Sequence, residues 1–191
     1  MRKIVFDIET RNIFSDVGGR DPSLLDISVV CIHDSENDSY QSFVQENLGK
    51  LWPIIEKTDV LIGYNSNHFD IPLLNKYYPG DLTKIKSIDL LEDIRKSIGR
   101  RVKMDQVAEG TLGINKSGHG LQAITWWNNG EIDKIIKYCI DDVKITKELY
   151  EHALKNKELK FKEGGKIMPI NLDISNWNEF EDNAMNHTLP F

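Results

Sequence analysis

Residues 131–155 carry apolar side chains every three or four positions, which is the period of an amphipathic helix. The apolar positions are Ile132, Ile135, Ile136, Cys139, Ile140, Val143, Ile145 and Leu149. A helix with so broad an apolar face must bury that face against another layer of structure. We therefore expect a long helix that packs on the core of a folded domain.

Short runs rich in β-branched and aromatic residues predict strands earlier in the chain. The expected strands are 2–8, 27–33, 39–44, 59–63 and 85–90, and the other expected helices start at Pro53 or cover 69–78, 90–98, 103–112 and 119–127. Segments 158–162 and 166–171 predict a hairpin around Gly164-Gly165. Strands first, and then strands alternating with helices, indicate an α/β domain with a mixed sheet.

Composition restricts the class of protein further. A chain of 191 residues fits one domain, and its longest apolar run, Ile27 to Ile32, is too short to cross a membrane. Asp7 and Glu9 interrupt any secretory signal, and two cysteines are too few for a disulfide framework, so we expect a cytoplasmic protein. A net charge of −6 argues against coating nucleic acid by bulk electrostatics, but acidic residues could still hold cations at a small site.

Asp7-Ile8-Glu9 closes the first predicted strand. Side chains alternate along a strand, so Asp7 and Glu9 project from the same face. Two carboxylates this close repel each other, and one is pushed toward protonation unless a cation lies between them. A lone D-x-E motif is expected about once by chance in this composition and carries little weight by itself.

Two further acidic motifs follow in the chain. Asn65, Phe69 and Asp70 form an N-x-x-x-F-D motif that leads into a predicted helix directly after a predicted strand. Tyr138 and Asp142 are four residues apart in the long predicted helix and therefore share one of its faces. All three motifs in this order are expected roughly 0.005 times by chance in such a composition.

In this order the motifs resemble those of the DEDD superfamily of 3′–5′ exonucleases, and specifically its tyrosine subgroup (DEDDy). This subgroup includes the proofreading domains of family B DNA polymerases. The resemblance covers about residues 1–155. The histidine subgroup would place a histidine at position 137, where this chain has Lys137.

The resemblance implies a ribonuclease H-like fold, an α/β architecture in which helices flank a mixed central sheet, and a two-metal mechanism. It assigns Asp7, Glu9, Asp70 and Asp142 as metal ligands and Tyr138 as the residue that positions the attacking water. Carboxylate oxygens are hard ligands that suit Mg²⁺ or Mn²⁺. A phenol with a pKa near ~10 is a poor base at neutral pH, so it orients water rather than deprotonating it.

The resemblance also implies substrate contacts. Asn65 and Phe69 match positions near the terminal nucleotide, and Ile8 would reach the last base. Phe69 and Ile8 have core packing as their alternative role. Lys116 belongs to the segment 112–116, which is similar to one in stand-alone exonucleases related to family B polymerases, and it would contact a phosphate.

Two other features are candidates for nucleic-acid contact. A basic run with no acid within it contains Arg95, Lys96, Arg100, Arg101 and Lys103. It could follow the backbone of a strand or could simply be a solvated face. Trp126 and Trp127 could stack on bases, although adjacent helical residues point in different directions, which favours a core role for at least one.

We therefore expect a metal-dependent 3′–5′ exonuclease that acts on nucleic acid with a free, single-stranded 3′ end. The resemblance to polymerase domains favours DNA. One alternative is an exoribonuclease, because no motif here reveals contacts to a 2′-hydroxyl. Another is a catalytically silent nucleic-acid-binding module, although such a module would have no reason to keep repelling carboxylates together.

The sequence predicts an exonuclease domain over residues 1–170 and an acidic tail over 171–191. The tail ends Thr188-Leu189-Pro190-Phe191, which is similar to the tip of bacterial single-stranded-DNA-binding proteins. Such an end could dock on a replication or repair protein. The alternative is that Trp177 and Phe180 pack on the core while the last residues are disordered.

Overall fold

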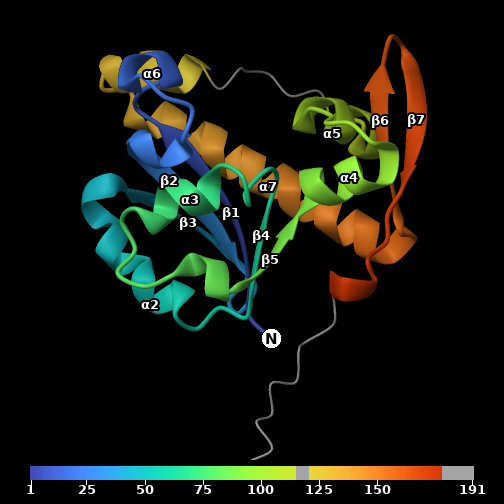
Figure 1. The fold of residues 1–191 in the computed structure, drawn as a ribbon, viewed down its shortest axis with the longest axis horizontal. Coiled ribbons are helices and arrows are strands. Elements are labelled where there is room, and N and C mark those ends of the chain that lie inside the picture. The colour runs from blue at the N-terminus through green and yellow to red at the C-terminus, as the bar shows by residue number, and fades with distance from the viewer. Residues whose placement is uncertain (115–120, 178–191) are drawn as a thin grey trace, which may run out of the picture.

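The computed structural model describes residues 1–114 and 121–177 and is built on one central sheet (Figure 1). The sheet has five strands in the order β3-β2-β1-β4-β5. Their bounds are β1 Lys3–Thr10, β2 Ile27–Asp34, β3 Ser39–Val44, β4 Val60–Gly63 and β5 Lys86–Asp89. The first three strands are antiparallel, while β4 and β5 run parallel to β1, so the sheet is mixed as the sequence predicted.

Strand β1 lies at the centre of the sheet and separates two apolar clusters. Ile4, Phe6 and Ile8 pack into one cluster, and Val5 packs into the other. This is the alternation that the sequence predicted, and it leaves Asp7 and Glu9 on the same face as Val5. The two acidic side chains therefore interrupt an otherwise apolar surface in the middle of the sheet.

Helices cover both faces of the sheet (Figure 1). The Val5 face is covered by α7, Ile132–Asn156, which crosses β1 and β2. Around that face lie α4 Leu90–Ile98, α5 Met104–Leu112, α6 Leu121–Asn128 and the hairpin of β6 Glu158–Glu163 and β7 Lys166–Asn171. The opposite face is covered by α1 Phe14–Val17, α2 Trp52–Ile55, α3 Asp70–Asn75 and 3-10 turns at Pro22–Leu24, Gln45–Lys50 and Leu82–Lys84.

Most predicted elements are confirmed to within a few residues, and the main difference is in α3. The sequence predicted a helix over 69–78, whereas α3 ends at Asn75, and Tyr77 and Tyr78 continue only as turns hydrogen-bonded to Leu74. The hairpin turn has positive φ angles at both Gly164 and Gly165, as a two-residue turn of type I′ requires. Among the described residues, no helix is both long and apolar enough to cross a bilayer.

The packed core extends past residue 170. Leu172 is buried, and Trp177, in a last 3-10 turn at Ser175–Trp177, is only 1% exposed. Its ring stacks on that of Tyr150 with centroids 5.2 Å apart, and its indole N–H donates to Asp93 Oδ2 at 2.8 Å. One interpretation of the tail predicted this core position for Trp177. Phe180 and Thr188–Phe191 lie outside the described residues.

The contacts of Trp177 predict a large effect on stability. Replacing Trp177 with Ala should lower the free energy of unfolding by about 3–5 kcal/mol, because it removes a fully buried aromatic side chain. Denaturant unfolding followed by circular dichroism measures this. Ile167→Ala is the matched control, because Ile167 is 58% exposed on β7 and its loss should change stability by no more than about 0.5 kcal/mol. Equal effects of the two substitutions would mean that the C-terminal segment does not dock.

Candidate active site

Three carboxylates from two elements meet over the centre of the sheet. Asp7 and Glu9 project from the face of β1 that α7 covers, and Asp142 comes from α7 itself. One carboxylate oxygen of each residue lies within 4.8 Å of the other two. Glu9 and Asp142 are buried and Asp7 is half-buried. Negative charges held this close and away from bulk water repel each other strongly unless cations or protons compensate them.

A β-bulge lies beside this cluster. Glu9 pairs with Val29, whereas the next residue, Thr10, pairs with Ile27, so Ser28 is an extra residue in β2. A bulge bends its strand and changes the direction of nearby side chains, and such bulges are over-represented next to active sites. The irregular end of the β1–β2 pair therefore coincides with the acidic cluster.

Asp70 is the fourth predicted ligand, and it lies next to Asp7 rather than within the tight group of three. It is the first residue of α3 and is 5% exposed. Burial raises the pKa of Asp70 well above its usual range, and the negative charges of Asp7 and Asp89 raise it further. Hydrogen bonds from the backbone N–H groups of Asp70 and Ile8 oppose this shift. The structure thus groups three of the predicted carboxylates tightly and leaves Asp70 outside that group but within reach of the Asp7 charge.

Asp89 organises the loop that leads to Asp70, although no motif in the sequence singled it out. Its side chain caps α4 by accepting the backbone N–H groups of Leu91 and Glu92. It also accepts the N–H of Asn65 at 2.8 Å and that of Asn67 at 3.0 Å, and burial raises its pKa. An aspartate between a predicted strand and a predicted helix is a recognisable N-cap signal, but its reach into the β4–α3 loop has no sequence signal.

Tyr138 lies one helical turn before Asp142 on α7, as the spacing predicted. The ring of Trp126, from α6, packs edge-to-face on the Tyr138 ring, with centroids 5.9 Å apart at 64°. Trp127 points elsewhere, and the guanidinium of Arg11 lies over its ring at 4.5 Å. Trp126 is therefore placed to hold the orientation of the tyrosine.

The remaining residues of this turn of α7 have structural contacts. Cys139 is fully buried, and its thiol donates to the Asp7 carbonyl at 3.3 Å, directly behind the acidic cluster. Cys31, the partner of Asp7 in the β1–β2 register, is buried as well, so both cysteines occupy core positions. Asp141 pairs with Lys144 at 3.1 Å and is 49% exposed.

The residues predicted to contact substrate have different surroundings in the structure. Ile8 is 5% exposed and packs in the cluster on the far side of the sheet from Asp7, which fits its alternative core role. Phe69 is half-buried and contacts Phe14 edge-on, with ring centroids 6.2 Å apart. Asn65 has a positive φ of 69°, and its amide oxygen accepts from Arg101 at 2.7 Å. The predicted phosphate contact Lys116 lies outside the described residues.

The basic run does not form one continuous face. Lys96 pairs with Asp93 at 3.0 Å on its own helix, and Arg100 pairs with Glu163 on β6 at 2.7 Å. Arg95 and Arg101 instead both line a pocket beside Asn65. The run therefore divides into two cations in ion pairs, Lys96 and Arg100, and two that line a pocket, Arg95 and Arg101.

A mixed five-stranded sheet, covered on both faces and carrying a carboxylate cluster on its central strand, defines an α/β protein equipped to bind cations. The chain belongs to the RNase_H superfamily, because the model of that superfamily matches residues 4–154. This membership confirms the ribonuclease H-like fold that the motifs predicted and supports a nuclease-type function. The tyrosine subgroup is compatible with the match and remains a prediction.

One solved structure with the same fold is the family B DNA polymerase from the hyperthermophilic archaeon Pyrobaculum calidifontis. The two structures superpose with a TM-score of 0.63 and 21% sequence identity, over 81% of this chain. This chain spans only 24% of the polymerase chain, so the likeness concerns one part of a larger protein. A search of curated proteins finds no match to this sequence.

The donor set of the cluster fits divalent metal ions. Nucleases of the ribonuclease H-like superfamily use such ions, and the cluster offers only carboxylate oxygens. Oxygen-only sites with few protein ligands suit Mg²⁺ or Mn²⁺, because these ions keep positions for water and phosphate oxygens.

Proposed function

We propose that this protein is a metal-dependent 3′–5′ exonuclease that removes nucleotides from the 3′ end of single-stranded DNA. One observation carries the proposal: Asp7, Glu9 and Asp142 lie within 4.8 Å of one another although α7 is far from β1 in sequence. Two features support the other residues of the DEDDy pattern: the charge of Asp7 acts on Asp70, and Tyr138 lies one helical turn before Asp142 on α7. Superfamily membership supports a nuclease. The resemblance of the three motifs to those of DEDDy exonucleases supports the 3′–5′ direction.

In this proposal Asp7, Glu9, Asp70 and Asp142 hold two divalent cations. Such a pair of ions stabilises both the attacking and the leaving oxygen of an in-line phosphoryl displacement. The protein contributes rigidity, since β1 and α7 fix three of the carboxylates and the N–H of Ile8 fixes Asp70. Burial of the cluster also strengthens its electrostatic interactions with bound charges.

Tyr138 would act on the attacking water. Its hydroxyl can accept or donate one hydrogen bond, which is enough to orient a water molecule for attack. The contact with Trp126 restricts the tilt of the ring, and α7 sets its distance from Asp142. The tyrosine therefore serves as a positioning group in the reaction and needs no change in its own protonation state.

Digestion of end-labelled oligonucleotides tests the proposal directly. With Mg²⁺ or Mn²⁺, a 5′-labelled single-stranded DNA should give a ladder of shortening products, whereas a 3′-labelled one should release labelled mononucleotide at once. Excess EDTA should stop both reactions. Full hydrolysis in EDTA would contradict the metal requirement, and release of mononucleotide from the 5′ end would contradict the direction. An RNA oligonucleotide degraded faster than DNA would identify the alternative substrate, RNA.

A further inference from the structure

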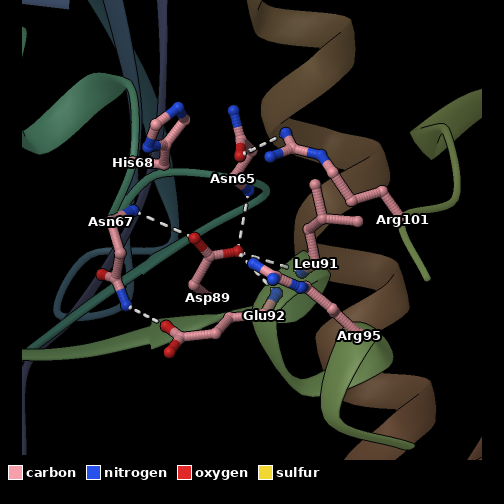
Figure 2. Close-up of a pocket in the computed structure, with 8 residues that line it drawn as sticks. All are labelled: Asn65, Asn67, His68, Asp89, Leu91, Glu92, Arg95 and Arg101. Atoms are coloured by element: carbon pink, nitrogen blue, oxygen red, sulfur yellow. Dashed lines mark hydrogen bonds between the residues drawn. The ribbon is translucent and has the colours of Figure 1, made fainter. Parts of the chain in front are cut away.

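A pocket of about 300 Å³ lies between the β4–α3 loop, which leads to Asp70, and the start of α4 (Figure 2). Its lining residues are Asn65, Asn67, His68, Asp89, Leu91, Glu92, Arg95 and Arg101. Figure 2 shows the two arginines reaching the pocket from one side, opposite Asn67 and His68. The pocket is thus a polar cavity with basic groups along one wall.

The two acids of this pocket are already engaged in holding its walls. Asp89 is 5% exposed and accepts four backbone N–H groups, two from the β4–α3 loop and two from the first turn of α4. Glu92 accepts the side-chain amide of Asn67 at 2.6 Å and lies 3.7 Å from Lys96. Neither carboxylate forms an ion pair with an arginine of the pocket within the part of the chain that the structure describes.

The two arginine side chains have N–H groups that no described residue accepts from. Over residues 1–114 and 121–177, the side chain of Arg95 makes no hydrogen bond or ion pair, and the side chain of Arg101 donates to the neutral amide oxygen of Asn65. Lys96 and Arg100, in the same basic run, are both paired with carboxylates. A guanidinium group is suited to bind the oxygens of a phosphate, often through two parallel hydrogen bonds. The wall of the pocket therefore offers hydrogen-bond donors to an anion, and no anionic side chain among the described residues occupies them.

The location of the pocket indicates which anion it binds. His68 forms part of its lining and lies two residues before Asp70, the first residue of α3. A strand whose 3′-terminal phosphodiester lies at the acidic cluster must continue across a neighbouring surface, and it carries one negative charge per nucleotide. The pocket borders the loop that leads to Asp70, and two of its lining residues are arginines with hydrogen-bond donors that the described residues leave unused.

We propose that Arg95 and Arg101 bind a backbone phosphate of the substrate strand on the 5′ side of the bond that is cleaved. This inference rests on the proposed exonuclease function. Asn65 links the two sites, because it accepts from Arg101 and lies in the loop that leads to Asp70. The pocket thereby makes the enzyme prefer a strand of several nucleotides over a single nucleotide ester.

Binding measured without turnover tests the site independently of catalysis. The probe is a fluorescent single-stranded oligothymidylate in Ca²⁺, followed by anisotropy. Arg95→Gln should weaken binding about 10-fold, and the double substitution with Arg101→Gln about 10- to 100-fold, as expected when charge-assisted hydrogen bonds are removed. The slope of log K against log salt should fall in magnitude by about 0.7 for each phosphate that the protein no longer neutralises.

Lys96→Gln is the matched control, because Lys96 is an exposed cation on the same helix whose partners are residues of that helix. It should leave the dissociation constant within about twofold of the unmodified protein, as expected for a surface ion pair. Arg95→Gln breaks no polar interaction within the described chain, so thermal unfolding should confirm an intact fold. Equal affinities of Arg95→Gln and Lys96→Gln would overturn the proposal.

A second measurement places the phosphate. The p-nitrophenyl ester of thymidine 5′-phosphate has a cleavable phosphodiester but no nucleotide on the 5′ side. Arg95→Gln should lower kcat/KM for the oligonucleotide at least about tenfold more than for this ester. Equal reductions on both substrates would show that Arg95 acts at the cleaved bond itself and would overturn the upstream assignment. If the unmodified protein cleaves neither substrate, the exonuclease proposal fails, while the binding measurement still decides whether the arginines bind a strand.

Discussion

Asp142→Asn should lower the rate of oligonucleotide hydrolysis by at least about a thousandfold while leaving the fold intact. The substitution keeps the shape of the side chain but removes one of three carboxylates that lie within 4.8 Å of each other. Metal ligation supplies several kcal/mol of charge stabilisation to a transition state of this type, which corresponds to that factor. Asp7→Ala should have a similar effect. Single-turnover hydrolysis of a labelled single strand in Mg²⁺ measures both.

Asp141, the residue before Asp142, provides the matched control. Asp141→Asn removes the same charge one position earlier on α7, from a half-exposed carboxylate that pairs with Lys144. Its rate should stay within about twofold of the unmodified protein, since exposed ion pairs contribute little. If Asp141→Asn and Asp142→Asn reduce the rate equally, bulk charge rather than ligation explains the effect.

The same pair of variants should also differ in stability. In EDTA, Asp142→Asn should raise the melting temperature, because it relieves repulsion within the acidic cluster. Addition of Mg²⁺ should stabilise the unmodified protein more than this variant, since a ligand that binds only the folded state stabilises it. A melting temperature of the unmodified protein that does not respond to Mg²⁺ or Mn²⁺ would contradict the metal site without any measurement of activity.

Tyr138→Phe should slow the chemical step by about 10- to 1000-fold, the range for removal of one positioned hydrogen bond in a transition state. Only the hydroxyl is removed, so the stabilisation by Mg²⁺ should be unchanged. Tyr40→Phe, on β3, is the control for removal of a phenolic hydroxyl outside the site. An unchanged single-turnover rate in Tyr138→Phe would mean that this tyrosine only packs against Trp126.

The sequence predicted those parts of the fold and site that depend on short-range periodicity. Alternation at the end of the first strand placed Asp7 and Glu9 on one face, and helical spacing placed Tyr138 and Asp142 on one face of the long helix. These rules hold because an extended strand repeats every two residues and a helix every 3.6. The order of the three motifs then supplied the pairing of β1 with α7 by resemblance, which periodicity alone does not give.

Long-range contacts made by ordinary polar residues could not be predicted in this way. Asp89 is a plain N-cap in the sequence, and only the fold brings the N–H groups of Asn65 and Asn67 to it. The basic run was one group in the sequence, and it divides because Glu163 on β6 reaches Arg100 but no acid reaches Arg95 within the described residues. Such partners are set by how elements pack, and their spacing along the chain carries no signal.

The distance in sequence between β1 and α7 has a consequence for synthesis of the protein. Translation proceeds from the N-terminus, so a growing chain contains Asp7, Glu9 and Asp70 long before it contains Asp142. The tight group of three carboxylates cannot form until α7 has left the ribosome and closed over the sheet. A polypeptide interrupted before that point would lack the complete carboxylate cluster, so on the proposed function it could not cut nucleic acid in the cell that is making it.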